Sequence, residues 1–207
     1  MTSQKIAIVD YGMGNIFSLE KKLRRLNTAV ITSSIPDEIM NADKIILPGV
    51  GHFGRAMNKL KDLDLITALN HAVIENKTPI LGICLGMQLM TQGSEEGNIE
   101  GLGWFNCKTE RLQVNEPYRY KVPHTGWNTI EHNETSPLLQ NVPSSSEMYF
   151  VHTYGVLNAE DNEILTTTVY ETPFTSGLVK HNIFGMQFHP EKSHDLGEQI
   201  FKNFIAI

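Results

Sequence analysis

Short apolar runs in the first half of the chain alternate with segments whose apolar residues recur at helical spacing. The apolar runs, which we predict to be strands, are residues 6–9, 29–32, 44–47 and 79–83. Helical spacing covers residues 16–26 and 64–75, and a further helix is expected to begin near Leu85. Strands that are apolar throughout and separated by helices form mostly parallel sheets with helices on both faces. The pattern therefore predicts a doubly wound α/β fold.

The second half of the chain has a different pattern of apolar and polar residues, with short strand-like runs and turn-rich connections. These runs are residues 104–108, 147–152, 163–170, 177–179 and 183–188, which we expect to be antiparallel additions to the sheet. Residues 195–204 predict a closing helix, with Ser193 as a potential N-terminal cap. We find no repeat or convincing linker, so we expect residues 1–207 to form a single domain.

Charge and hydropathy narrow the classes of function. The formal net charge is −6, which argues against binding to nucleic acid or an anionic membrane, because both need clustered Lys and Arg. No apolar run approaches the length of a membrane span or of a signal-peptide core. A cytoplasmic location follows as an expectation, and in that compartment Cys84 and Cys107 should stay reduced.

Cys84 is the strongest candidate for chemistry. Gly82-Ile83-Cys84-Leu85-Gly86 is a cysteine version of the G-x-S-x-G nucleophile elbow, between a predicted buried strand and a helix. The helix N-terminus would stabilise a thiolate, and the amide of Leu85 could bind an oxyanion. The alternative is a small buried core cysteine, which is the role that we expect for Cys107.

His189 and Glu191 are the candidates for the other catalytic side chains. His189 follows a predicted strand and precedes Pro190, which favours an extended backbone, so its side chain and that of Glu191 could project to one side. His189 would exchange protons with the thiol, and Glu191 would orient the imidazole. An ordinary hydrogen-bonded histidine at the end of a strand is the alternative.

Two glycine-containing loops follow the first and third predicted strands. Pro48-Gly49-Val50-Gly51 should lie at the same edge of the sheet as Cys84, where the N–H of Val50 or Gly51 could be a second oxyanion donor. Its alternative is a simple turn. Asp10-Tyr11-Gly12-Met13-Gly14-Asn15 resembles the start of a dinucleotide fingerprint, but Phe17 replaces the third glycine. A nucleotide site is therefore not predicted, and no other cofactor is expected. No metal site is predicted either, since the other histidines lack metal-ligand spacing.

These motifs, in their order along the chain, resemble the class I, or triad-type, glutamine amidotransferases. Within that family, further motifs resemble the glutaminase subunits of imidazole glycerol phosphate synthases. They are Asp10 to Asn15, Pro48 to Phe53, Gly82 to Gln88, Gly126-Trp127-Asn128, Tyr149 to His152 and Gln187 to Ser193. The resemblance covers nearly the whole length and implies the α/β fold already predicted.

The resemblance implies a substrate, a partner and further site residues. Cys84 would form a thioester from glutamine and release ammonia to a separate cyclase subunit in histidine biosynthesis. Gln88 and Glu96 would bind glutamine, with backbone groups of Thr153 and Tyr154 nearby. Asn15, Trp127 and Lys192 fall where the family places the cyclase interface. Since a glutaminase without its acceptor would waste glutamine, we hypothesise that the Val50 peptide completes the oxyanion site only when the partner is loaded.

Three alternatives remain at this point. Thr153 and Gly155 depart from the residues common in histidine-pathway members, which keeps open a related glutaminase subunit of a surface-sugar amidotransferase. A DJ-1/PfpI-type cysteine hydrolase would share the cysteine elbow, but Leu85 stands where its peptidase-like members carry histidine. A catalytically silent, flavodoxin-like binding module would share only the fold.

Overall fold

The computed structural model describes residues 4–132 and 136–207, so residues 1–3 and 133–135 of the expected domain lie outside that range. The strands of the main sheet are β1 (Lys5–Val9), β2 (Ala29–Ser33), β3 (Lys44–Gly49), β4 (Ile80–Cys84), β5 (Gly93–Ser94), β6 (Ile99–Glu100), β7 (Thr109–Arg111), β10 (Tyr154–Val156), β11 (Ile164–Tyr170), β12 (Thr172–Lys180) and β13 (Ile183–Met186). Their spatial order is β2-β1-β3-β4-β13-β12-β10-β7-β5-β6, and β11 pairs with β12.

The first half of the sheet is parallel, as predicted. β1 pairs in parallel with β2 and β3, and β4 pairs in parallel with β3 and β13. Successive residues of these strands point to opposite faces. Ala7 and Val9 of β1 belong to one hydrophobic cluster, and Ile6 and Ile8 belong to the other. Both faces therefore need a covering layer, which explains why the strands are apolar throughout.

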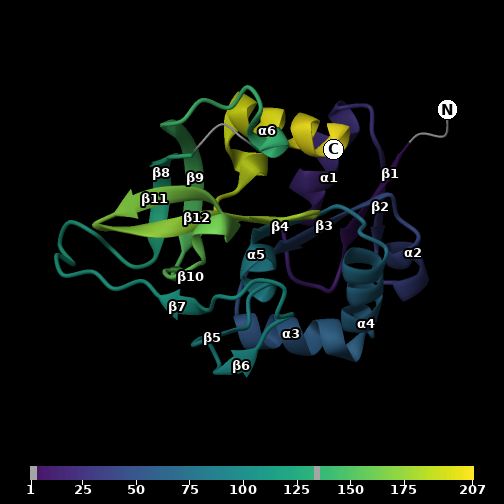
Figure 1. Cartoon of the computed structure of the whole chain (residues 1–207), viewed down its shortest axis with the longest axis horizontal. Helices are drawn as coiled ribbons and strands as arrows, with labels where there is room; N and C mark the ends of the chain where they lie inside the picture. The colour runs from purple at the N-terminus through teal and green to yellow at the C-terminus, as the bar shows by residue number, and fades with distance from the viewer. Residues whose placement is uncertain (1–3, 133–135) are drawn as a thin grey trace.

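Helices provide these two layers. They are α1 (Ile16–Arg25), α2 (Pro36–Met40), α3 (Phe53–Asp62), α4 (Leu65–Asn70), the π-helix η1 (His71–Glu75), α5 (Leu85–Leu89), α6 (His194–Ala206) and the 3-10 helices η2 (Pro137–Leu139), η3 (Asp161–Glu163) and η4 (Pro190–Lys192). Helices α1 and α6 lie on one side of the parallel strands, and α3 and α4 lie on the other (Figure 1). The predicted helices on both faces are confirmed.

The second half differs from the prediction in two strands. The expected strand at residues 147–152 is β9 (Ser146–His152), but it pairs with β8 (His124–Ile130) in a separate two-stranded sheet. Residues 104–108 form no strand. Trp104, Phe105 and Cys107 are buried, yet the amides of Trp104 and Phe105 both donate to the carbonyl of Met90. This segment covers the end of α5 and does not extend the sheet.

The predicted antiparallel additions at residues 163–170, 177–179 and 183–188 correspond to β11, β12 and β13. β11 and β13 each run antiparallel to β12, while β13 also runs parallel to β4. β13 therefore joins the two halves of the sheet. Within the described residues, none of the helices combines the length and the apolarity that a bilayer crossing requires.

Candidate active site

Cys84 is the last residue of β4 and directly precedes α5. Its φ angle is 54°, in the left-handed region that side chains other than glycine rarely adopt. The side chain is 5% exposed. The predicted elbow between a buried strand and a helix is confirmed, and Cys84 at its apex is strained. Strain of this kind persists where the surrounding structure fixes the backbone.

The glycines that flank Cys84 are required by close packing. A Cβ atom on Gly86 would overlap the carbonyl oxygen of Leu47 in β3. A Cβ atom on Gly82 would lie 2.8 Å from the amide nitrogen of Met87. Neither glycine has a positive φ, so the strain of the turn falls on Cys84 itself. Helix α5 therefore packs directly against β3, the strand that leads into Val50.

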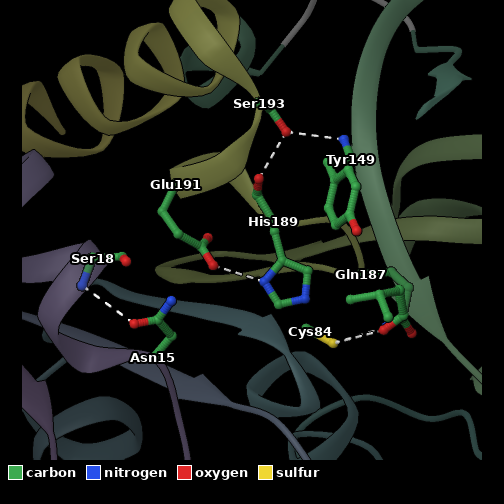
Figure 2. A network of polar contacts seen from close by, with 9 residues as sticks. Asn15, Ser18, Cys84, Tyr149, Gln187, His189, Glu191 and Ser193 are labelled. Carbon is green, nitrogen blue, oxygen red and sulfur yellow. Dashed lines mark hydrogen bonds and ion pairs between the residues drawn. The ribbon is translucent and has the colours of Figure 1, made fainter. Parts of the chain in front are cut away.

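His189 and Glu191 form a buried pair. Nδ1 of His189 and Oε1 of Glu191 are 2.7 Å apart, and the two side chains are 2% and 6% exposed. His189 has the expected extended backbone before Pro190, but Glu191 lies in η4. The two side chains therefore meet through a 3-10 turn and not through strand alternation. The imidazole lies between Glu191 and Cys84 (Figure 2).

The charge of His189 is set by these neighbours. Burial lowers its pKa, but interactions with Cys84 and Glu191 outweigh burial and raise the pKa to about 10. Nε2 is buried and has no hydrogen-bond partner within residues 4–132 and 136–207. The imidazole is therefore protonated at neutral pH, with one N–H held by Glu191 and the other on the side of Cys84 (Figure 2).

Ser193 supports this arrangement in a way that the sequence did not predict. It occupies the N-cap position of α6, but its side chain makes no cap hydrogen bond. Instead, its hydroxyl donates to the carbonyl of His189 at 2.7 Å and accepts from the amide of Tyr149 at 3.0 Å (Figure 2). The prediction of a side-chain cap is wrong, because the hydroxyl ties the backbone of the His189 segment to β9.

A cavity of about 290 Å³ opens beside Cys84. Its lining comprises Val50, Gly51, Cys84, Leu85, Gln88, Glu96, Pro123, Val151, His152, Thr153 and Tyr154. Every residue predicted for the oxyanion site or for glutamine binding is among them. The structure thus brings together segments that are far apart in the sequence around the thiol.

The polar groups of this cavity are held in place by other parts of the chain. Nε2 of Gln88 donates to the carbonyl of Tyr154 at 2.8 Å and to Oε1 of Gln187 at 3.0 Å. Both amide hydrogens are then in use, which leaves the carbonyl oxygen of Gln88 for a ligand. Oε2 of Glu96 accepts from the amide of Phe53 at 2.7 Å. Glu96 is therefore anchored to the start of α3 and is not a freely solvated charge.

The loop predicted to hold the second oxyanion donor is braced by Tyr11. The Tyr11 hydroxyl donates to the carbonyl of Pro48 at 2.7 Å, and a Cβ atom on Gly49 would collide with that hydroxyl. Burial raises the pKa of Tyr11, so it stays a neutral donor. Gly51 has a φ of 114°, which favours glycine. The glycine-rich segment after β1 thus supports this loop, a role that the comparison with nucleotide fingerprints did not reveal.

The predicted interface residues fall into two groups. Asn15 caps α1 through a 3.4 Å hydrogen bond from the amide of Ser18, and it lines a small cavity with Val50, His189 and Glu191 (Figure 2).

Trp127 and Lys192 meet at Tyr149. The Trp127 and Tyr149 ring centroids are 5.9 Å apart, and Nζ of Lys192 lies 5.3 Å from the Tyr149 ring. Trp127 also stacks on His194 and is 44% exposed. The exposed Trp127 fits a protein interface, since tryptophan is enriched at such sites.

The buried His152, which lines the cavity, and its neighbour His124 have a role that the sequence motifs did not predict. Nδ1 of His152 lies 2.9 Å from the carbonyl of Tyr154, and its Nε2 lies 3.0 Å from Nδ1 of His124. Because a carbonyl only accepts, His152 must carry its proton on Nδ1 and accept from His124. Burial lowers the pKa of His124 to about 4 and that of His152 to about 3. Both are neutral at pH 7, and both brace Tyr154.

Cys107 is free, buried and remote from this chemistry, as predicted. It belongs to the hydrophobic cluster beneath α3 and α4. Burial, with smaller contributions from nearby charges, raises its pKa to about 12. A thiol in this state neither attacks substrates nor exchanges disulfides readily at neutral pH.

Comparisons with known proteins agree with this geometry. The family model for glutamine amidotransferase class-I matches residues 7–207. Imidazole glycerol phosphate synthase subunit HisH 2 of Methanococcus maripaludis is 46% identical over 200 residues, which are 97% of this chain and 98% of that protein. Subunit HisH of a Geobacillus species is 44% identical, over 98% of this chain and 96% of that protein.

A solved structure supports the fold independently. A glutamine amidotransferase of Thermotoga maritima superimposes with a TM-score of 0.65 at 17% identity, covering 100% of this chain and 82% of that one. The alternatives of a DJ-1/PfpI-type hydrolase and of a silent binding module are set aside by the family match. The chain belongs to the class I glutamine amidotransferases and, among them, to the family of the HisH subunits of imidazole glycerol phosphate synthase.

Proposed function

We propose that this chain is a glutaminase subunit that hydrolyses glutamine at Cys84 and supplies ammonia to the cyclase subunit of an imidazole glycerol phosphate synthase. The observation that carries the proposal is the cavity in which Cys84, Gln88 and Glu96 meet beside the His189–Glu191 pair. The relatives that are 39–46% identical over nearly the whole chain are named as subunits of that synthase.

The geometry supports a definite sequence of proton and bond movements. The Cys84 thiolate attacks the side-chain amide carbon of glutamine, and the negative oxygen of the tetrahedral intermediate is bound by the amide of Leu85 and by that of Val50 or Gly51. Protonated His189 then donates its Nε2 proton to the leaving nitrogen, so the C–N bond breaks and ammonia departs. The now neutral His189 takes a proton from water, which adds to the thioester carbon. The C–S bond then breaks, so that the Cys84 thiolate and the protonated imidazole are restored and glutamate leaves, its new carboxyl group losing a proton to the solvent.

Glutamine binding is assigned to the remaining polar groups of the cavity. The carbonyl oxygen of Gln88 and the carboxylate of Glu96 are acceptors, which suit the amino and amide nitrogens of glutamine. The carbonyl of Tyr154 already accepts from Gln88 and His152, so contacts from the Thr153–Tyr154 backbone would come from N–H groups.

The cyclase is proposed to dock around Asn15, Trp127 and Lys192. Val50 is 42% exposed and lines cavities with both Cys84 and Asn15, so a partner that touched this surface would reach the oxyanion loop directly. This supports the hypothesis that the Val50 peptide completes the oxyanion site only in the loaded complex. An N–H of Val50 that pointed at the site both with and without acceptor ligand would contradict it.

The setting of this reaction is proposed to be the cytoplasm, with no nucleic-acid or membrane partner. The formal net charge of −6 and two unpaired cysteines support it.

The decisive test is glutamate release from glutamine by the purified chain, with and without the cyclase subunit of the same organism and its nucleotide ligand. Strong stimulation by the loaded partner that disappears in Cys84→Ala is the expected result. Turnover that requires Cys84 but is not stimulated would instead support a surface-sugar amidotransferase. No turnover under any condition would overturn the proposed triad.

A further inference from the structure

The side chain of Gln187 is fully buried next to the proposed nucleophile. Its relative exposure is 0%, and its Nε2 lies 3.7 Å from Sγ of Cys84, within range of an N–H···S hydrogen bond. Its Oε1 accepts from Nε2 of Gln88 at 3.0 Å. Gln187 is two residues before His189 and lies beside Cys84 and His189 (Figure 2).

The orientation of the Gln187 amide is fixed by a chain of donors and acceptors. The carbonyl of Tyr154 can only accept, so Gln88 must present its NH₂ group there, at 2.8 Å. The second hydrogen of that NH₂ group goes to Gln187, which must therefore present its oxygen to Gln88. The NH₂ group of Gln187 is then the one that faces Sγ, so the sulfur is offered a donor.

The carbonyl of Tyr154 is in turn held by the imidazole of His152, 2.9 Å away, and His152 is held by His124. Reversing the Gln187 amide would bring its NH₂ group against the NH₂ group of Gln88, so that two donors would face each other and neither would have an acceptor there. A buried polar group without a partner costs more than a hydrogen bond gains. The network is thus built to keep an N–H directed at the sulfur.

We propose that Gln187 is a further catalytic residue, whose amide N–H stabilises the Cys84 thiolate from a different direction than His189 does. The inference rests on the proposed role of Cys84 as the nucleophile. A donor to the thiolate is useful twice, because the sulfur carries negative charge before it attacks glutamine and again when the thioester C–S bond breaks. The contact also links glutamine binding at Gln88 to the reactivity of Cys84.

The test is the pH dependence of Cys84 alkylation by iodoacetamide in the full chain, with Cys107→Ala as background so that one thiol remains. Gln187→Met keeps the size of the side chain and removes the donor. Its alkylation midpoint should rise by about one pH unit, because hydrogen bonds to charged groups are worth about one to two such units. Glutamine turnover near pH 7 should fall about tenfold and recover at higher pH. Gln92→Met, at an exposed glutamine, is the matched control and should change neither profile.

The outcomes separate the two proposals. If unsubstituted Cys84 reacts only at the pH of an ordinary thiol, the proposed nucleophile itself is in error. If it reacts at low pH and Gln187→Met has the same midpoint, the role of Gln187 is overturned. Should Gln187→Met fail to fold, the side-chain NH₂ signals of Gln187 in the ¹⁵N-labelled parent chain decide. They should titrate with the alkylation midpoint and stop titrating in Cys84→Ser, and signals that ignore the thiol would also overturn the inference.

Discussion

Two sites in this chain bury histidines equally deeply but give them opposite charges. His189 is 2% exposed and is protonated at neutral pH, whereas His124 and His152, at 2% and 6%, are neutral. Burial opposes the charge at both sites. The difference lies in the partners. His189 interacts with Cys84 and has a carboxylate oxygen of Glu191 2.7 Å from Nδ1, while His152 has a carbonyl and a second imidazole.

The comparison shows how one fold obtains two functions from one residue type. A charged imidazole beside Cys84 can stabilise a thiolate and deliver a proton. A neutral pair, with one donor and one acceptor on each ring, can hold a backbone carbonyl in place without introducing charge near the substrate.

The largest expected effect comes from removing the carboxylate that distinguishes the two sites. Glu191→Gln keeps the shape of the side chain, but His189 loses its counter-charge and its fixed tautomer, so kcat for glutamine hydrolysis should fall on the order of 10³- to 10⁴-fold. Steady-state glutamate release with the loaded partner measures it. Glu198→Gln, at a surface ion pair, should leave kcat unchanged. A loss of less than tenfold in Glu191→Gln would mean that the interaction with Cys84 is enough to keep His189 protonated.

Acid should destabilise the protein through the neutral pair. The pKa values of His124 and His152 are about 4 and 3 in the folded state, against about 6.5 in the unfolded chain. Between the folded and unfolded pKa values, the unfolded state binds more protons than the folded state. The free energy of unfolding therefore rises as the pH rises from about 4 to about 6.5. The change should be roughly 3 kcal/mol for each independently titrating histidine. Urea unfolding across this pH range measures the slope.

The contribution of His189 to the free energy of unfolding changes with pH in the opposite direction. Its pKa is raised, so its contribution to stability is present below about 6.5 and is lost as the pH rises toward about 10. Replacing His124 and His152 together should reduce the change of the free energy of unfolding between pH 4 and 6.5. It should leave the change at alkaline pH as it is in the parent chain. An acid slope that persists in the double variant would show that other groups cause it.

A smaller effect is expected from breaking the neutral pair alone. In His124→Phe the new ring can occupy the space between Phe150 and Tyr170, where the imidazole now stacks on both. Nε2 of His152 would then lack its donor, at a cost of about 1–3 kcal/mol in the free energy of unfolding. Chemical denaturation at pH 7 measures this loss, with Tyr118→Phe, at a fully exposed side chain, as control. Equal stability of His124→Phe and the parent would show that a water replaces the lost donor.

The smallest effect concerns a histidine that belongs to neither site. His181 is exposed and has a φ of 54°, which glycine adopts more easily. His181→Gly should raise the free energy of unfolding by about 0.5 kcal/mol, because relief of strain slightly exceeds the added entropy of the unfolded chain. Thermal unfolding would reveal it, and the pH profile should not change. A lower melting temperature would contradict the expectation.

Local patterns predicted most of the parallel half, because a strand buried on both faces must be apolar at every position. Helix α3 also had a usable signal, in the helical spacing of Phe53, Ala56, Met57 and Leu60, but it was not among the predicted helices. Residues 104–108 have the composition of a strand, yet their apolar side chains serve to cover α5. The composition of residues 104–108 predicts that their side chains are buried. Only tertiary contacts decide that they pack against α5 and do not join the sheet.

The candidate site was predictable where one segment carried its own geometry. The elbow at Cys84 and the His189–Glu191 pair are of this kind. Gln187, His124 and His152 act through hydrogen bonds between segments far apart in sequence, for example between Gln88 and Gln187. No spacing rule along one chain reports such a network, because each member gains its role from residues that approach only in the folded protein.

The contact between Gly86 and the carbonyl of Leu47 sets a mechanical limit on regulation. With no room for even one carbon atom between them, the nucleophile turn and the strand before the oxyanion loop must move as one rigid body. A partner cannot adjust the distance between thiol and loop by sliding α5 along β3. The movement by which the proposed partner would complete the oxyanion site must therefore begin after Gly49, in the peptides of Val50 and Gly51.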